Sequence, residues 1–246
     1  MSTRSGGAIA LVGSGEYLPV MDEIDRALLA TLPAGAPVAL LPTASGLEPG
    51  SPARWNALGE RHFAALGAPT IPLLLLHRED AFDESVLARL REARFFYFSG
   101  GNPTHVVETL QGTPAWAVIS SALAEGAVIA GCSAGAMMLG SYTIRIRDAL
   151  AGRPPTWAPA LAVVPQVAVL PHFDRFAARF GTGTIQHLTE SAPEGLIVLG
   201  IDEDTALLRL RPGEPWRAAG RQTVSVFRAE RPVEVLSPGD EIDLDR

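Results

Sequence analysis

A serine set between two glycines is the feature of this sequence that most clearly indicates chemistry. The segment Gly131-Cys132-Ser133-Ala134-Gly135 has the pattern G-x-S-x-G and joins an apolar run to a segment rich in Ala, Met and Leu. A strand that turns sharply into a helix holds such a serine in a strained turn, and small neighbours avoid clashes. Its hydroxyl then projects above the sheet at the positive end of a helix dipole, which stabilises an oxyanion. We therefore expect Ser133 to be a nucleophile.

Two other interpretations of this segment stay open. Gly131 and Gly135 could serve only the close packing of a helix on a strand, with Ser133 as the N-cap of the helix. Alternatively, Cys132 could be the nucleophile, although a residue one place before the centre of the glycine frame points back into the core. Small buried thiols are common there, so we expect Cys132 to be inert.

His172 is the histidine best placed to act as the base that a serine nucleophile requires. It follows the apolar run 167–171, and the carboxyl ends of parallel strands are where catalytic groups gather. The other four histidines lie in helix-like, turn or loop segments. Of these we expect His62 and His77 to be surface residues.

An acidic cluster supplies candidates for the carboxylate that orients such a histidine. Asp202-Glu203-Asp204 follows the apolar run 196–201, and a solvated turn is the alternative explanation for three consecutive acids. Asp148, fifteen positions after Ser133, is a competing candidate. The chain order Ser, His, acid differs from the Ser, acid, His order of the α/β-hydrolases, which disfavours that class.

A glycine pair could complete the site. Gly100-Gly101-Asn102-Pro103 follows the aromatic run 95–98, and glycine lets backbone N–H groups approach a substrate closely. With the N–H of Ala134, one of these amides could form an oxyanion hole. A tight turn before a helix that begins with proline would explain the same residues, and both explanations can hold together.

The elements that position these residues follow from the pattern of the first half of the chain. Continuous apolar runs, typical of strands covered on both faces, alternate with segments of helical spacing. The expected strands are 8–12, 38–42, 70–75, 94–98 and 127–130, and the expected helices are 21–32, 54–66 and 84–90. Repeated units of this kind predict an α/β fold with a doubly wound, mainly parallel sheet. Asp80 and Asp83 are expected N-cap residues for the third helix.

After about residue 195 the strand-like runs become shorter and turn residues separate them. We expect a final core strand at 196–201, followed over about 205–246 by a mainly antiparallel extension of the same sheet. A chain of 246 residues suits one domain, so we treat 1–246 as a single unit.

Composition excludes several classes of function. The formal net charge is −7, which argues against binding to nucleic acid or to an anionic membrane surface. The chain has no lysine, which excludes a lysine Schiff base and the P-loop lysine. Gly13-Ser14-Gly15-Glu16 lacks the third glycine of a dinucleotide site, and no Cys/His cluster has zinc-site spacing, so we expect neither cofactor nor metal. The first apolar run has five residues, too short for a leader or a membrane span, so we expect a cytoplasmic protein.

These motifs together resemble peptidase family S51, the aspartyl dipeptidases and cyanophycinases. The resemblance covers about residues 8–210 and rests on Gly13-Ser14-Gly15-Glu16, Pro42-Thr43-Ala44-Ser45, Gly100-Gly101-Asn102, Gly131–Ala136, His172-Phe173 and Gly200-Ile201-Asp202-Glu203. It implies a flavodoxin-like fold of the class I glutamine amidotransferase type and a serine peptidase that acts on small peptides. Its catalytic residues would be Ser133, His172 and Glu203, with Asp148 still open, and the amides of Gly101 and Ala134 would form the oxyanion hole. A homodimer is a further expectation at the level of the family.

The resemblance leaves the substrate open between two classes. Aspartyl dipeptidases remove an N-terminal aspartate, whereas cyanophycinases cut a β-linked Asp-Arg polymer. Leu170-Pro171 precede His172 where cyanophycinases carry polar residues, and only Arg175 and Arg179 follow it nearby. Either arginine could pair with a substrate carboxylate, and Asn102 is a further expected substrate contact. A non-catalytic ligand-binding module on the same scaffold is the alternative from a different class.

Overall fold

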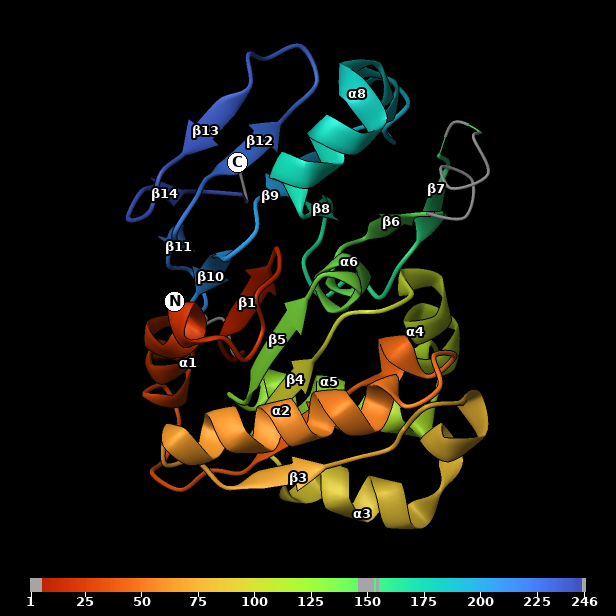
Figure 1. Ribbon diagram of the computed structural model, residues 1–246, viewed down its shortest axis with the longest axis vertical. Coiled ribbons are helices and arrows are strands. Elements are labelled where there is room, and N and C mark those ends of the chain that lie inside the picture. Colours follow the sequence, from red (N-terminus) through yellow and green to blue (C-terminus); the bar gives the residue numbers. More distant parts are fainter. Residues whose placement is uncertain (1–5, 146–152, 154, 245–246) are drawn as a thin grey trace.

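The computed structural model describes residues 6–145, 153 and 155–244 (Figure 1). Its elements form a large central sheet with helices on both faces and a smaller second sheet beside it. No helix in the described part of the chain is long and apolar enough to cross a membrane.

The central sheet has eight strands. Five of them are parallel, and the three at one edge are antiparallel additions. In spatial order the strands are β14 (Glu241–Ile242), β11 (Trp216–Gly220), β10 (Thr205–Arg209), β1 (Ile9–Val12), β5 (Val128–Cys132), β4 (Phe95–Phe98), β2 (Val38–Leu41) and β3 (Thr70–Pro72).

The second sheet has four strands and contains the two strands that end just before His172 and Glu203. Their order is β13 (Glu234–Leu236), β12 (Val224–Phe227), β9 (Ile197–Ile201) and β8 (Val167–Pro171). The pair β8 and β9 is parallel, so both strands end at the same edge of this sheet. A separate hairpin pairs β6 (Tyr142–Ile144) with β7 (Trp157–Pro159).

Helices cover both faces of the central sheet because its strands are apolar on both sides. Along β4, Phe95 and Tyr97 pack into one core cluster, whereas Phe96 and Phe98 pack into another. The first cluster lies under α1 (Asp22–Leu29) and α2 (Ser51–Ala65). The remaining helices are α3 (Glu84–Glu92), α4 (Pro103–Leu110), α5 (Pro114–Ala124), α6 (Ala134–Leu139) and α8 (Phe173–Glu190), with 3-10 turns at Pro19–Met21, Thr43–Ser45 and Arg78–Phe82.

The expected α/β architecture is confirmed, with two differences in the C-terminal part. The run expected to be the final core strand is β9, which lies in the second sheet and not in the central one. The runs after residue 205 do not all extend the central sheet: β10, β11 and β14 join it, while β12 and β13 join β9 and β8. The expected N-cap at Asp83 is present, since its side chain accepts a hydrogen bond from the N–H of Ser85. His77 is exposed as expected.

His62 is not the surface residue that its helix-like segment suggested. It is buried against α1, where its Nε2 lies 2.7 Å from Oδ2 of the buried Asp25 and its Nδ1 3.7 Å from Oδ1 of Asp22. Burial raises the pKa of Asp25, while the hydrogen bond with His62 lowers it. The pair therefore joins α1 to α2 and compensates for a polar group inside the core.

We predict that His62→Ala lowers the free energy of unfolding by about 3 kcal/mol, because it leaves Asp25 buried without its partner. The loss of stability should be larger at pH 7 than at pH 5, because without the hydrogen bond from His62 the folded-state pKa of Asp25 lies further above its unfolded value. A folded-state pKa above the unfolded value means that the folded protein holds the proton more tightly, so stability falls as pH rises. Urea unfolding at both pH values measures this, with Asp25→Leu/His62→Leu as the control. A loss in the single variant no greater than in the double variant would contradict the assignment.

Candidate active site

The structure brings Ser133, His172 and Glu203 together although they come from two different sheets. Ser133 follows β5 of the central sheet, whereas His172 and Glu203 follow β8 and β9 of the second. The Oγ of Ser133 lies 3.0 Å from Nε2 of His172, and Nδ1 of His172 lies 2.9 Å from Oε1 of Glu203. A hydroxyl, an imidazole and a carboxylate in this series can pass a proton from the hydroxyl to the imidazole.

Ser133 occupies a strained turn between strand and helix. Its φ of 53° and ψ of −114° are unusual for a residue with a side chain, and its N–H donates to the carbonyl of Val12 at 2.9 Å. A Cβ on Gly131 would lie 2.1 Å from the carbonyl oxygen of Gly135, so the turn closes only because the frame residue is glycine. This geometry is that of the sharp turn expected around a nucleophilic serine.

The three consecutive acids have three different environments. Asp202 accepts hydrogen bonds from the N–H and Oγ1 of Thr223 on the adjoining loop, and Asp204 pairs with Arg221 at 3.2 Å. Only Glu203 has a hydrogen bond to His172. The competing candidate Asp148 lies outside the described residues.

Arg175 forms an ion pair with the carboxylate of Glu203, whereas the sequence suggested that it could pair with a carboxylate of the substrate. One of its guanidinium nitrogens lies 2.6 Å from Oε2 of Glu203, while the N–H of Glu203 donates to Oδ1 of Asp174 at 3.1 Å. Both carboxylate oxygens of Glu203 are thus engaged, one by the imidazole and one by the guanidinium. Arg175 is 75% exposed, so solvent screens this ion pair strongly. Arg179 is exposed on α8.

Gly101 and Ala134, whose amides were predicted to form an oxyanion hole, both lie close to Ser133. Gly101 has a φ of 146°, and a Cβ there would lie 2.3 Å from the backbone of Ala44, so this close approach requires glycine. A Cβ on the preceding Gly100 would be 3.3 Å from Cβ of Ser133, which places this loop directly beside the serine. Ala134 is the first residue of α6, so its N–H has no acceptor one turn earlier in the helix.

Asn102 has a structural role in addition to any contact with substrate. Its Oδ1 accepts a hydrogen bond from the N–H of His105 at 3.1 Å, which caps α4, and its own N–H donates to the carbonyl of Ala44 at 2.7 Å. These contacts hold the glycine loop against the segment that follows β2.

The environment of Cys132 disfavours a thiolate nucleophile. Its side chain is buried, and its Sγ donates to Oε2 of Glu16 at 2.8 Å. Burial raises the pKa of the thiol well above its usual value, and the Glu16 charge raises it further. The thiol is therefore protonated at neutral pH.

Glu16 was not identified from the sequence as part of the site. Its side chain is buried, and its carboxylate accepts hydrogen bonds from Cys132 and from the N–H of Gly100. Its only sequence signal is an acid in the loop after the first strand, next to the glycines that were examined for a nucleotide site.

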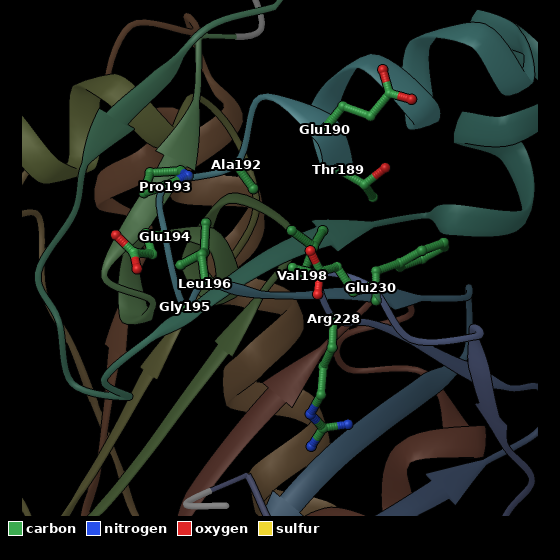
Figure 2. A pocket seen from close by; sticks show the side chains of 12 residues that line it. Thr189, Glu190, Ala192, Pro193, Glu194, Gly195, Leu196, Val198, Arg228 and Glu230 are labelled. Carbon is green, nitrogen blue, oxygen red and sulfur yellow. The ribbon is translucent and has the colours of Figure 1, made fainter.

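The described structure contains one pocket beside Asn102, the residue after the glycine pair, and another at the start of β9. A cavity of about 620 Å³ begins at Asn102 and extends between α4 and the hairpin of β6 and β7, with Thr143, Arg145 and Arg153 among its lining residues. The second, of about 330 Å³, is lined by Glu190, Leu196 and Glu230 among others (Figure 2). It lies where β9 begins, whereas Glu203 follows the other end of that strand.

No group of three or more His, Cys, Asp or Glu side chains in the described residues could hold a metal ion.

The fold and the matches to known proteins assign the chain to a family of peptidases. The model of peptidase family S51 matches residues 9–211, and the chain belongs to this family.

Individual relatives agree with this assignment. The chain is 30% identical over 189 residues to cyanophycinases from Synechococcus elongatus and Thermosynechococcus vestitus, a match that covers 74% of this chain and spans 57% of the length of those curated relatives. The crystal structure of a peptidase from an acI-B1 actinobacterium superposes with a TM-score of 0.86 at 31% identity, over 98% of both chains. A protein of Listeria monocytogenes EGD-e assigned as a peptidase E shares the fold, with a TM-score of 0.63 at 21% identity over 89% of this chain and 100% of that one.

We predict that Gly131→Ala lowers the free energy of unfolding by about 2 kcal/mol or more, because the added methyl group meets backbone atoms that cannot rotate away. Gly183→Ala in α8 is the matched control. No atom lies within 4 Å of its added Cβ, so the change should stabilise the protein by about 0.5 kcal/mol through the backbone entropy of glycine. Chemical denaturation of both variants tests this. Equal effects in the two would contradict the tight packing of the turn.

Proposed function

We propose that this protein is a serine peptidase that hydrolyses small peptides through an acyl-enzyme. The observation that carries the proposal is the hydrogen-bonded series of Ser133, His172 and Glu203, with distances of 3.0 and 2.9 Å. Membership of peptidase family S51 supports the same class of reaction.

In the proposed mechanism Ser133 Oγ attacks the carbonyl carbon of the scissile peptide bond as its proton passes to Nε2 of His172. Glu203 accepts the hydrogen bond from Nδ1–H of His172 and so favours the positively charged imidazolium. The N–H groups of Gly101 and Ala134 would donate to the oxyanion of the tetrahedral intermediate. His172 then gives its proton to the leaving amine, and a water molecule, activated by the same imidazole, releases the acyl group.

We further propose that the pocket beside Asn102 favours an acidic group of the substrate. Arg145 is exposed on the pocket wall, and Thr143 Oγ1 is buried there with no hydrogen-bond partner among the described residues. A carboxylate could accept hydrogen bonds from both, which would compensate for the unpaired hydroxyl. Arg175 is a weaker candidate for this task because Glu203 already engages it.

Ser133→Ala should lower kcat by about 10⁴-fold or more, because no other group can form the acyl-enzyme. The measurement is hydrolysis of a dipeptide library together with labelling by a fluorophosphonate, detected by intact mass. Wild type should gain one adduct, and the variant none. Ser121→Ala, at an exposed serine on α5, is the matched control and should behave as wild type.

The outcomes of that experiment separate the alternatives. Activity that survives Ser133→Ala but is lost in Cys132→Ser would identify the thiol as the nucleophile. Folded wild type that neither reacts with the probe nor cleaves any peptide would support a non-catalytic ligand-binding module. Cleavage of β-linked Asp-Arg peptides in preference to α-linked Asp peptides would assign a cyanophycinase-type activity.

Arg145→Gln should lower kcat/KM for dipeptides that begin with aspartate by about tenfold, because one charge-assisted hydrogen bond is lost. The corresponding asparagine dipeptides should be cleaved at unchanged rates, since they carry no charge for the guanidinium to bind. Arg217→Gln, at an exposed arginine on β11, controls for the change in net charge. A uniform loss over both substrates would rule out a role of Arg145 in charge recognition.

A further inference from the structure

The Glu16 carboxylate makes contacts that connect the two loops of the proposed oxyanion hole. Its Oε1 accepts a hydrogen bond from the N–H of Gly100 at 3.0 Å, and its Oε2 accepts one from the thiol of Cys132 at 2.8 Å. Gly100 directly precedes Gly101, and Cys132 directly precedes Ser133. We call these two hydrogen bonds the Glu16 bridge.

The strand order explains how one side chain reaches both loops. β5 lies between β1 and β4 in the central sheet, and all three are parallel, so their carboxyl ends meet at one edge. Glu16 comes from the loop after β1, Cys132 ends β5, and Gly100 follows β4. Glu16, in the loop after β1, thus contacts both the end of β5 and the loop after β4.

The backbone around Glu16 is constrained in a way that directs its side chain inward. Gly15 and Tyr17, on either side of it, have positive φ values of 86° and 64°. A left-handed conformation is uncommon for a bulky residue such as tyrosine and is held here by packing, since the Tyr17 ring lies 4.9 Å from that of Tyr97. Strain of this kind persists where the surrounding structure requires it, and it clusters at functional sites.

The bridge is also an unusual place for a carboxylate. Glu16 is 8% exposed, and no arginine or histidine of the described residues forms an ion pair with it. A buried carboxylate is costly unless it is hydrogen-bonded, and a neutral or apolar residue would fill this space at lower cost. Packing alone therefore does not account for an acid at this position.

We propose that Glu16 is a positioning residue that sets the distance between the Gly100-Gly101 loop and the Ser133 turn, and so holds the amides of Gly101 and Ala134 in register for an oxyanion. This inference rests on the proposed serine peptidase function. A Cβ added to Gly100 would lie 3.3 Å from both Oε1 of Glu16 and Cβ of Ser133, so the backbone of Gly100 packs closely against both side chains. A shift of either loop therefore changes the geometry at the serine.

The test measures the second-order rate of fluorophosphonate labelling, the final number of adducts, and kcat and KM separately. Glu16→Ala should slow labelling and lower kcat by about 10- to 100-fold with KM within about twofold, because misplaced oxyanion donors weaken transition-state binding more than ground-state binding. The final labelling should still reach one adduct for each chain, which a fraction of unfolded protein would not allow.

Two further sets of variants keep the test decisive if Glu16→Ala does not fold. Glu16→Gln keeps one carbonyl oxygen for Gly100 but cannot accept from both donors, so its effect should be smaller, about tenfold. Cys132→Ala removes one hydrogen bond of the bridge and should slow labelling several-fold, whereas Cys132→Ser keeps an O–H donor and should restore it. Tyr97→Phe is the matched control, because it removes the buried, unpaired hydroxyl of Tyr97 in the same cluster without touching the bridge.

Each outcome has a distinct meaning. Wild-type protein that is not labelled would overturn the proposed function itself. Labelled wild type, with folded Glu16→Gln and Cys132→Ala variants that react at the wild-type rate, would overturn the role of Glu16 alone. Slower labelling of these variants to a full final adduct, with Tyr97→Phe unchanged, would establish the bridge as part of the site.

Discussion

The hydrogen bond between Ser133 and His172 is the contact on which the site depends, because it joins the ends of strands from two different sheets. β5 supplies the serine from the central sheet and β8 the histidine from the second, and the side chains meet at 3.0 Å. Helix α6 makes this possible. All six of its residues are buried, and its two methionines belong to different core clusters: Met138 lies in the main core, and Met137 packs with Ala168 and Leu170 of β8.

The two sheets also approach each other through backbone contacts. A Cβ on Gly13, at the end of β1, would lie 2.1 Å from the carbonyl oxygen of Asp202, so only glycine lets these strand ends come together. The N–H of the same glycine donates to the carbonyl of Thr205 at 2.9 Å. The loop that carries Glu203 is thereby held against the edge where Ser133 lies. The acid, the base and the serine owe their alignment to this junction rather than to any one sheet.

Two carboxylates near the junction have different partners. Glu203 is hydrogen-bonded to the imidazole of His172 through one oxygen and forms an ion pair with Arg175 through the other. Glu16 accepts one hydrogen bond from Gly100 and one from Cys132, the neighbours of Gly101 and Ser133 in the chain. Two carboxylates of similar chemistry therefore have different environments, because one contacts an imidazole and a guanidinium and the other is enclosed by an amide and a protonated thiol.

The sequence by itself determined the local features of this protein. The glycine frame around Ser133, the strand-end positions of His172 and Glu203, and the doubly covered strands follow from patterns over a few residues, where backbone sterics and burial decide the outcome. Only the tertiary structure decided which acid meets His172, that Arg175 binds Glu203, that β12 and β13 leave the central sheet, and that His62 and Glu16 are buried. These are contacts between residues far apart in the chain, up to 116 positions for Glu16 and Cys132. Side-chain pairing across such distances depends on how whole elements pack, and no local pattern contains that information.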